Sequence, residues 1–187
     1  MPSLGWHLAI SLFVISSFVD KNEWKKAVLL VPFGILSDID AFIGIHRATL
    51  HNIFFILTPV LSFVALRALL RVRGEVRKMQ SFCYFCFASV LVALHVLLDA
   101  FHTGVFFFYP VVLSSYDLSF RLSVRETGLS TAIGCENVGR VGEVVYATVP
   151  SPGVPEIPLI GSGIEFVTFI CALLVFALKF LPPVFRH

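Results

Sequence analysis

Apolar residues along the chain gather into five runs, each long enough to be considered as a membrane-spanning helix. A spanning helix needs about 20 predominantly apolar residues, and the runs cover residues 4–20, 27–45, 50–70, 82–108 and 160–181. The first run has no preceding Lys or Arg and no small-residue cleavage site before Asp20, so we expect a permanent helix and not a signal peptide. The pattern predicts an all-α integral membrane bundle with about five transmembrane helices.

Basic residues predict the direction in which these helices cross. Lys and Arg in short loops stay on the cytoplasmic side, and here they cluster at residues 21–26 and 67–78. If both clusters are cytoplasmic, the chain between them crosses outward and returns, so the N-terminus lies outside and the C-terminus in the cytoplasm. The second run is interrupted by polar and helix-breaking residues, so four spans plus a re-entrant segment is the alternative; the interrupting residues are Pro32, Gly34, Asp38 and Asp40.

The segment before the last run has a different pattern. Apolar positions from Leu118 to Val124 alternate with Ser and Arg, as in a strand with one buried face. A glycine-containing stretch at 128–142 connects it to a second β-prone run at 144–149. We expect a small β-rich extracytoplasmic flap, with an irregular loop as the alternative. The chain then divides into a membrane bundle (1–109), the flap (110–158), and a last transmembrane helix with a cytoplasmic tail (159–187).

Composition agrees with a membrane protein. Of the 187 residues, 57% are apolar and 14% are charged, and the net charge is +2, whereas soluble domains average about 45–50% apolar and about 25% charged residues. These values exclude a soluble enzyme, a disordered chain and a nucleic-acid-binding protein. The expected partner is the lipid bilayer, and the sequence leaves the oligomeric state open.

Ionisable residues inside the apolar runs are the most informative positions. A charge at membrane depth is costly and usually belongs to a pathway or a site. On the five-pass topology these residues all lie near the outer ends of their helices, which predicts one shared site; they are His7, Asp38, Asp40, His46, His51, His95, Asp99 and His102.

Spacing assigns roles within this set. His95, Asp99 and His102 follow at intervals of four and three and so share one helical stripe, whereas Asp38 and Asp40 can face one cavity only where the helix is unwound. His7 is equally well explained as a histidine at the membrane interface, and His102 as an outer-sphere or substrate contact.

The candidate nitrogen and oxygen ligands outnumber the four of a structural zinc site, which indicates two divalent ions bridged by a carboxylate. Zinc fits the His content, and manganese, iron or magnesium fit a carboxylate-rich set. The expected ligands are His7, Asp38, Asp40, His46, His51, His95 and Asp99.

Three short motifs carry a family resemblance. They are Ser37-Asp38-Ile39-Asp40, His46-Arg47-Ala48-Thr49-Leu50-His51-Asn52 and His95-Val96-Leu97-Leu98-Asp99, with the early His7. This ordered set resembles the YdjM-like family of inner-membrane metal-dependent hydrolases over residues 5–112. The sequence departs from the family pattern at Ser37, Ala48 and Asn52 and in the order of Thr49 and Leu50. The positions of the expected metal ligands match the pattern.

The resemblance implies a metal-dependent hydrolase of a prokaryotic inner membrane. The HxxxD spacing is also similar to that of zinc-dependent phospholipase C, which suggests a phosphoester of a lipid or similar amphiphile as substrate. We expect Asp99 and His102 to act in catalysis and Asn52 to lie on the substrate side. Arg47 is the candidate phosphate contact because a guanidinium can bind phosphate with two prongs, and a headgroup anchor is its alternative role.

Other functions stay open at this point. A metal-activated water attacks an amide as well as a phosphoester, so a lipid amide hydrolase is possible. A metal or proton transporter would also place His and Asp within helices, and a nonenzymatic sensor could hold a structural metal. A transporter needs ionisable residues through the cytoplasmic half, where the sequence offers mainly apolar stretches and basic loops.

Overall fold

The computed structural model describes residues 3–43, 45–72, 82–102, 104–125, 128–141 and 159–180. The described α-helices are α1 (Leu4–Phe18), α2 (Trp24–Leu30), α3 (Asp40–Ile43), α4 (Ile53–Val72), α5 (Phe82–Ala100) and α6 (Gly163–Phe180). Three short 3₁₀ helices, η1 (Lys21–Glu23), η2 (Val31–Gly34) and η3 (Leu36–Ile39), lie between α1 and α3. Two strands, β1 (Ser114–Arg125) and β2 (Gly128–Arg140), form a hairpin.

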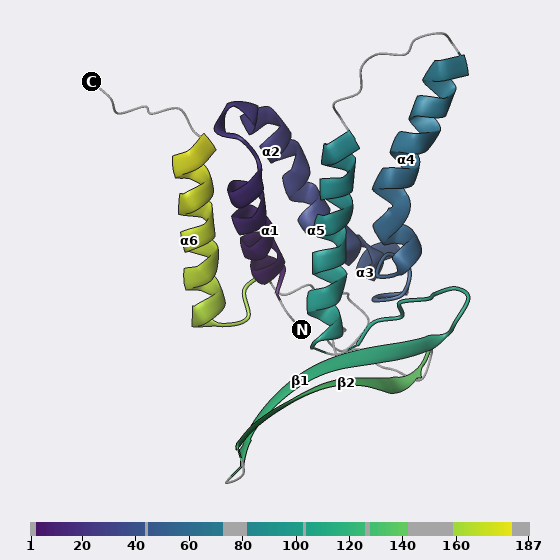
Figure 1. Cartoon of the computed structure of the whole chain (residues 1–187), viewed down its shortest axis with the longest axis vertical. Coiled ribbons are helices and arrows are strands. Elements are labelled where there is room, and N and C mark those ends of the chain that lie inside the picture. The colour runs from purple at the N-terminus through teal and green to yellow at the C-terminus, as the bar shows by residue number, and fades with distance from the viewer. Residues whose placement is uncertain are drawn as a thin grey trace.

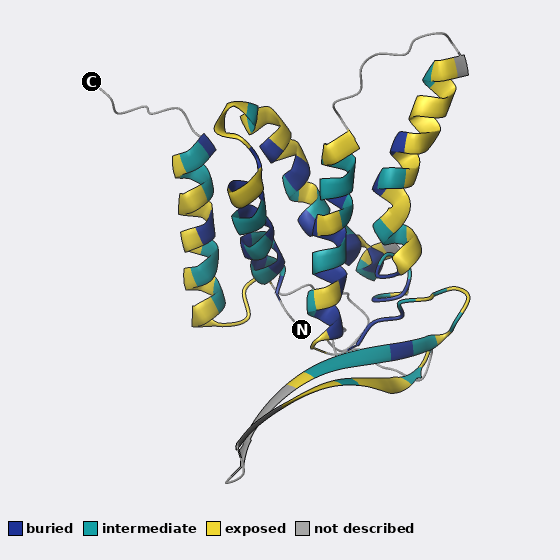
Figure 2. Cartoon of the chain, viewed as in Figure 1, coloured by how far each residue is buried: buried dark blue, intermediate teal, exposed yellow. Residues whose placement is uncertain are grey.

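Among the described residues, three helices are long and apolar enough to cross a membrane: α4, α5 and α6. The shorter α1 is also apolar; its 15 residues span about 22 Å at 1.5 Å per residue. The outward faces of α4 and α6 are mostly exposed (Figure 2), and they consist of large apolar residues such as Leu61 and Leu178. Apolar surface of this extent suits contact with lipid.

The second apolar run is a chain of short helices and not one regular spanning helix. Pro32 has no N–H to continue the helix, and the chain passes through η2 and η3 before α3 begins at Asp40. In Figure 1 this broken segment descends from η1 to the start of α4. The interruption agrees with the expected unwinding, and it corrects the expectation of a continuous helix over 27–45.

The helices alternate in direction. In Figure 1, α1, α4 and α6 run toward one end of the bundle, and α5 runs toward the end that holds the hairpin. The basic residues of η1, α2 and the last turns of α4 and α6 therefore share one end; they are Lys21, Lys25, Lys26, Arg67, Arg71 and Lys179. The hairpin and the segment around α3 lie at the other end.

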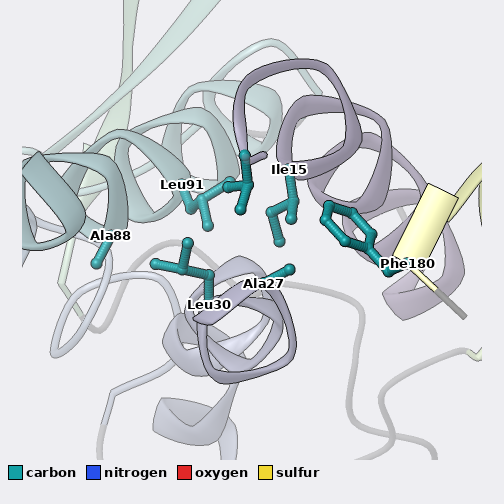
Figure 3. Close-up of a cluster of buried hydrophobic side chains, with 7 residues drawn as sticks. Ile15, Ala27, Leu30, Ala88, Leu91 and Phe180 are labelled. Carbon is teal, nitrogen blue, oxygen red and sulfur yellow. The ribbon is translucent and has the colours of Figure 1, made fainter. Parts of the chain in front are cut away.

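Apolar packing joins the helices at the basic end. Ile15 of α1, Ala27 and Leu30 of α2, Leu91 of α5 and Phe180 of α6 meet in one buried cluster (Figure 3). A second cluster lies toward the hairpin and consists of Val92, Val96, Ala100 and Val105. The two clusters hold α5 in the middle of the bundle along its whole length.

The fourth apolar run ends as a helix earlier than expected. We expected it to reach residue 108, but α5 ends at Ala100. The chain turns at Gly104, which has φ +81 and lies against Ser115 and Tyr116, so a side chain there would be strained and crowded. Val105 then bridges to Tyr116 in β1.

The flap is an antiparallel hairpin whose second strand differs from the expected one. β2 is formed by the glycine-containing stretch that we expected to be a connection. Glycine is rare in strands; Gly134 lies opposite Ser119 in β1, and a Cβ there would lie 2.6 Å from Oγ of Ser119, which would have to rotate away. The β-prone run at 144–149 lies outside the described residues.

Topology is testable with the cysteine of the hairpin. Cys135 is exposed in β2, so a variant with Cys83, Cys86 and Cys171 changed to Ala keeps one reporter. Because basic loops stay in the cytoplasm, we expect a membrane-impermeant maleimide to label Cys135 in intact cells. As the control, Asn22→Cys with Cys135→Ala should react only after permeabilisation. The reverse pattern would show that the bundle has the opposite orientation.

Candidate metal centre

The polar centre of the bundle combines buried side chains from three elements. His7 comes from α1, Asp38 from η3, and His95 and Asp99 from α5. One ligand atom from each lies within 4.8 Å of the others. The rings of His7 and His95 stack with their centroids 3.8 Å apart. This group could hold a metal ion.

His51 adds a third imidazole to this group. Its Nε2 lies 3.0 Å from Oδ2 of Asp99 and 3.1 Å from Nε2 of His95, and Oδ1 of Asp38 is 3.8 Å away. His51 is wholly buried. We call His7, Asp38, His51, His95 and Asp99 together the His/Asp cluster.

The other ring nitrogens of His51 and His95 determine which atoms face the cluster. Nδ1 of His95 lies 2.8 Å from the carbonyl oxygen of Gly34, which can only accept, so this nitrogen carries a proton. Nδ1 of His51 likewise donates to Oδ2 of Asp40 at 2.8 Å. In the neutral form of each ring, Nε2 is then an unprotonated acceptor that points at the other ring.

The centre of the cluster therefore contains acceptors facing acceptors. Two Nε2 atoms lie 3.1 Å apart, and Oδ2 of Asp38 and Oδ2 of Asp99 are buried without a hydrogen-bond donor among the described residues. Unpaired buried acceptors are costly. A proton on Nε2 of His51 can donate to His95 or to Oδ2 of Asp99, and a divalent cation could bind ligand atoms of His7, Asp38, His95 and Asp99 together.

The distances also suit a metal ion. Ligands about 2.1 Å from an ion, at angles of about 90–110°, are about 3.0–3.4 Å apart. The contacts Asp99–His51, His51–His95, His95–Asp38 and His7–Asp99 measure 3.0, 3.1, 3.3 and 3.3 Å. These four contacts have the spacing of neighbouring ligands of one ion, while His51–Asp38 and His95–Asp99 are longer, at 3.8 and 3.9 Å.

Asp40 and His46, both expected as ligands, lie behind His51. Asp40 accepts from Nδ1 of His46 through Oδ1 and from Nδ1 of His51 through Oδ2, each at 2.8 Å. The backbone N–H of Leu50 also donates to Oδ2. A carboxylate that orients a ligating imidazole in this way is common in metal sites. A second ion at Asp40 would have to displace these donors.

Arg47, expected to contact a phosphate, holds Asp99 in place. Its side chain is wholly buried, and Nη2 lies 3.4 Å from Oδ1 of Asp99. Nη1 donates to the backbone carbonyls of Asp99 and Gly104, each at 3.3 Å. The left-handed backbone of Arg47, with φ 63, places this side chain across the end of α5. The guanidinium therefore positions Asp99 and satisfies the carbonyls where α5 ends.

Two further expected site residues lie outside the cluster. Asn52 caps α4: Oδ1 accepts from the N–H of Phe55, and Nδ2 donates to the carbonyls of Ala48 and Thr49. His102 lies beyond the end of α5 and is exposed, so it leaves the expected stripe with His95 and Asp99.

Backbone groups complete the site in a way that side-chain motifs do not reveal. The carbonyl of Gly34 and the N–H of Leu50 fix His95 and Asp40. The sequence signal for the Gly34 carbonyl was the interruption at Pro32 and Gly34, because a broken helix leaves a carbonyl free of helical hydrogen bonding. No comparable signal marks Leu50.

Comparisons of this chain with known proteins found no match. No protein-family model matches it, and neither a curated protein nor a solved structure is similar to it. The geometry of the His/Asp cluster therefore carries the functional argument.

Substituting Gly34 tests the support of His95. A Cβ at Gly34 would lie 2.6 Å from Cβ of Ser11 in α1, so Gly34→Ala must push η2 away from α1 and move the carbonyl that orients His95. We expect Gly34→Ala to destabilise the protein by about 1–3 kcal/mol, as overpacking does, measured as a lower thermal midpoint in detergent. Ser11→Gly should restore stability, and Gly163→Ala, with open space around it, should be neutral. An unchanged midpoint in Gly34→Ala would contradict this close packing.

Metal affinity separates ligands from orienting residues. His95→Ala and His51→Ala remove proposed ligands, so we expect the purified variants to lose bound metal in elemental analysis. Asp40→Asn keeps the ligands but misorients His51, and we expect a 10–100-fold weaker affinity. His102→Ala is the matched histidine control and should bind metal like the wild type. Full metal retention in both His51→Ala and His95→Ala would contradict the site.

Proposed function

We propose that this protein is a membrane-embedded metal-dependent hydrolase that acts on a phosphoester of a lipid or similar amphiphile. The observation that carries this proposal is the His/Asp cluster, in which buried acceptors converge at ligand spacing with their orienting groups already in place. Such preorganisation is characteristic of sites whose ligands must not move during a reaction.

The residues present suit this chemistry. A divalent ion, with zinc preferred for three imidazoles and manganese or iron as alternatives, lowers the pKa of a bound water and stabilises negative charge on a phosphoryl or carbonyl oxygen. Asp38 and Asp99 supply negative charge to hold the ion. Asp40 and Gly34 keep His51 and His95 in the ligating tautomer, and Arg47 holds Asp99.

The position of the cluster supports an amphiphilic substrate. It lies at the hairpin end of helices that are long and apolar enough to cross a membrane, where the polar and apolar parts of a lipid meet. The basic residues at the opposite end favour the extracytoplasmic side for the cluster. A prokaryotic inner membrane and a lipid phosphoester form part of this proposal, as the family resemblance implies.

A closed site is favoured over a transport path. Toward the basic end the cluster is followed by the apolar residues Ile15, Leu30 and Leu91. At the basic end itself, Glu23 of η1 bonds to Lys26 and Tyr84. No ionisable relay joins the two ends within the described residues.

Hydrolysis is tested with purified protein of known metal content. We expect wild-type protein to cleave a member of a panel of phospholipids, isoprenoid phosphates and N-acyl lipid amides, and His95→Ala to cleave none. His102→Ala should keep its metal; if His102 transfers a proton, its kcat falls by about 10²–10⁴-fold. Cleavage of the amides alone would assign an amide hydrolase. Metal-loaded protein that cleaves nothing but moves metal across liposomes would overturn the proposal in favour of a transporter.

A further inference from the structure

An apolar hollow lies between the broken segment and the helices α4 and α5. Its volume is about 210 Å³, and its lining includes Phe33, Leu36, Phe55, Thr58, Phe85 and Val92. None of the described residues that line it is charged. An apolar hollow of this kind does not hold water well and readily accepts an apolar group.

A second hollow of about 290 Å³ continues toward the basic end. It shares Phe33 and Phe85 with the first, and Lys26 and Tyr84 contribute to its lining. Along α5 the lining residues run from Val92 to Tyr84, which is about 12 Å at 1.5 Å per residue. The two hollows therefore follow the direction of the helices, as an extended hydrocarbon chain in a bilayer does.

At its hairpin end the hollow is lined by residues that neighbour the proposed metal ligands along the chain. Val92 lies one helical turn before His95 in α5, and Leu36 lies two residues before Asp38 in η3. Gly34, next to Phe33, is the residue whose carbonyl orients His95. A molecule whose apolar chain filled the hollow would hold its polar end at Asp38 and His95.

We propose that this hollow binds a hydrocarbon chain of the substrate. The substrate is then an amphiphile whose scissile bond lies in a polar group attached directly to an extended chain. This inference rests on the proposed hydrolase function for the identity of the polar end. The chain faces the basic end and the headgroup faces the hairpin, which is the orientation of a lipid in the outer leaflet on the favoured topology. The lining favours hydrocarbon over a peptide because it offers no charged partner for one.

A matched pair of substitutions in α4 tests the hollow. Thr58 and the neighbouring Leu57 are both exposed, but only Thr58 lines the hollow. Thr58→Phe should fill the hollow, and Leu57→Phe adds a ring of the same size outside it. Neither residue belongs to the His/Asp cluster, so both variants should bind metal like the wild type.

Binding is measured with a phosphatidylglycerol that carries a diazirine midway along one acyl chain. We expect illumination to give adducts on Phe33 and Phe85 in the wild type and in Leu57→Phe, identified by mass spectrometry. In Thr58→Phe these adducts should fall at least tenfold, because each methylene excluded from an apolar site weakens binding about fourfold. Equal adducts in both variants, or none in the wild type, would overturn the proposal.

Kinetics distinguish a substrate chain from a resident lipid. With matched phosphoesters of 16-carbon and 4-carbon chains, Thr58→Phe should raise KM for the long chain at least tenfold and leave the short-chain KM unchanged. Lost adducts with an unchanged long-chain KM would show that a structural lipid fills the hollow, which contradicts the proposal. If the wild type hydrolyses nothing but its adducts respond to Thr58→Phe, the hollow binds hydrocarbon and the proposed hydrolase function is what fails.

Discussion

Two imidazole nitrogens that face each other 3.1 Å apart, between two buried carboxylates, impose the main constraint on this structure. Acceptors brought this close in an apolar bundle are costly unless a proton or a metal ion lies between them. The surrounding structure makes this arrangement possible: Gly34 and Asp40 hold the protons of His95 and His51 on the outer ring nitrogens. Much of the irregular backbone at the hairpin end is explained by these contacts.

The broken segment shows how the helices serve the cluster. A continuous helix over 27–45 would satisfy its own carbonyls and would point Asp38 and Asp40 in different directions. Division into η2, η3 and α3 frees the Gly34 carbonyl for His95 and lets Asp38 face the cluster while Asp40 supports His51. The same break in the helix also leaves the apolar hollow beside α4 and α5, and Phe33 and Leu36 line that hollow.

Interactions behind the cluster separate residues that look equivalent in the sequence. Asp40 and Asp38 are both buried carboxylates, yet Asp40 accepts three donors, whereas Oδ2 of Asp38 has no donor among the residues that the structure describes. Arg47 had the chemistry of a phosphate contact, but burial against the end of α5 makes it a support for Asp99. His102 shared a helical stripe with Asp99 only as long as the helix continued.

The sequence by itself determined the apolar helices, the concentration of His and Asp at one end, and the interruption at Pro32 and Gly34, because these follow from composition and local spacing. It missed β2, since glycine has low strand propensity and the pairing of Gly134 with Ser119 across the hairpin is a contact that only the tertiary structure reveals. Tertiary structure alone decided which atoms of the cluster face one another. The tautomers of His51 and His95 depend on partners 11 and 61 residues away, and spacing within one helix carries no information about such contacts.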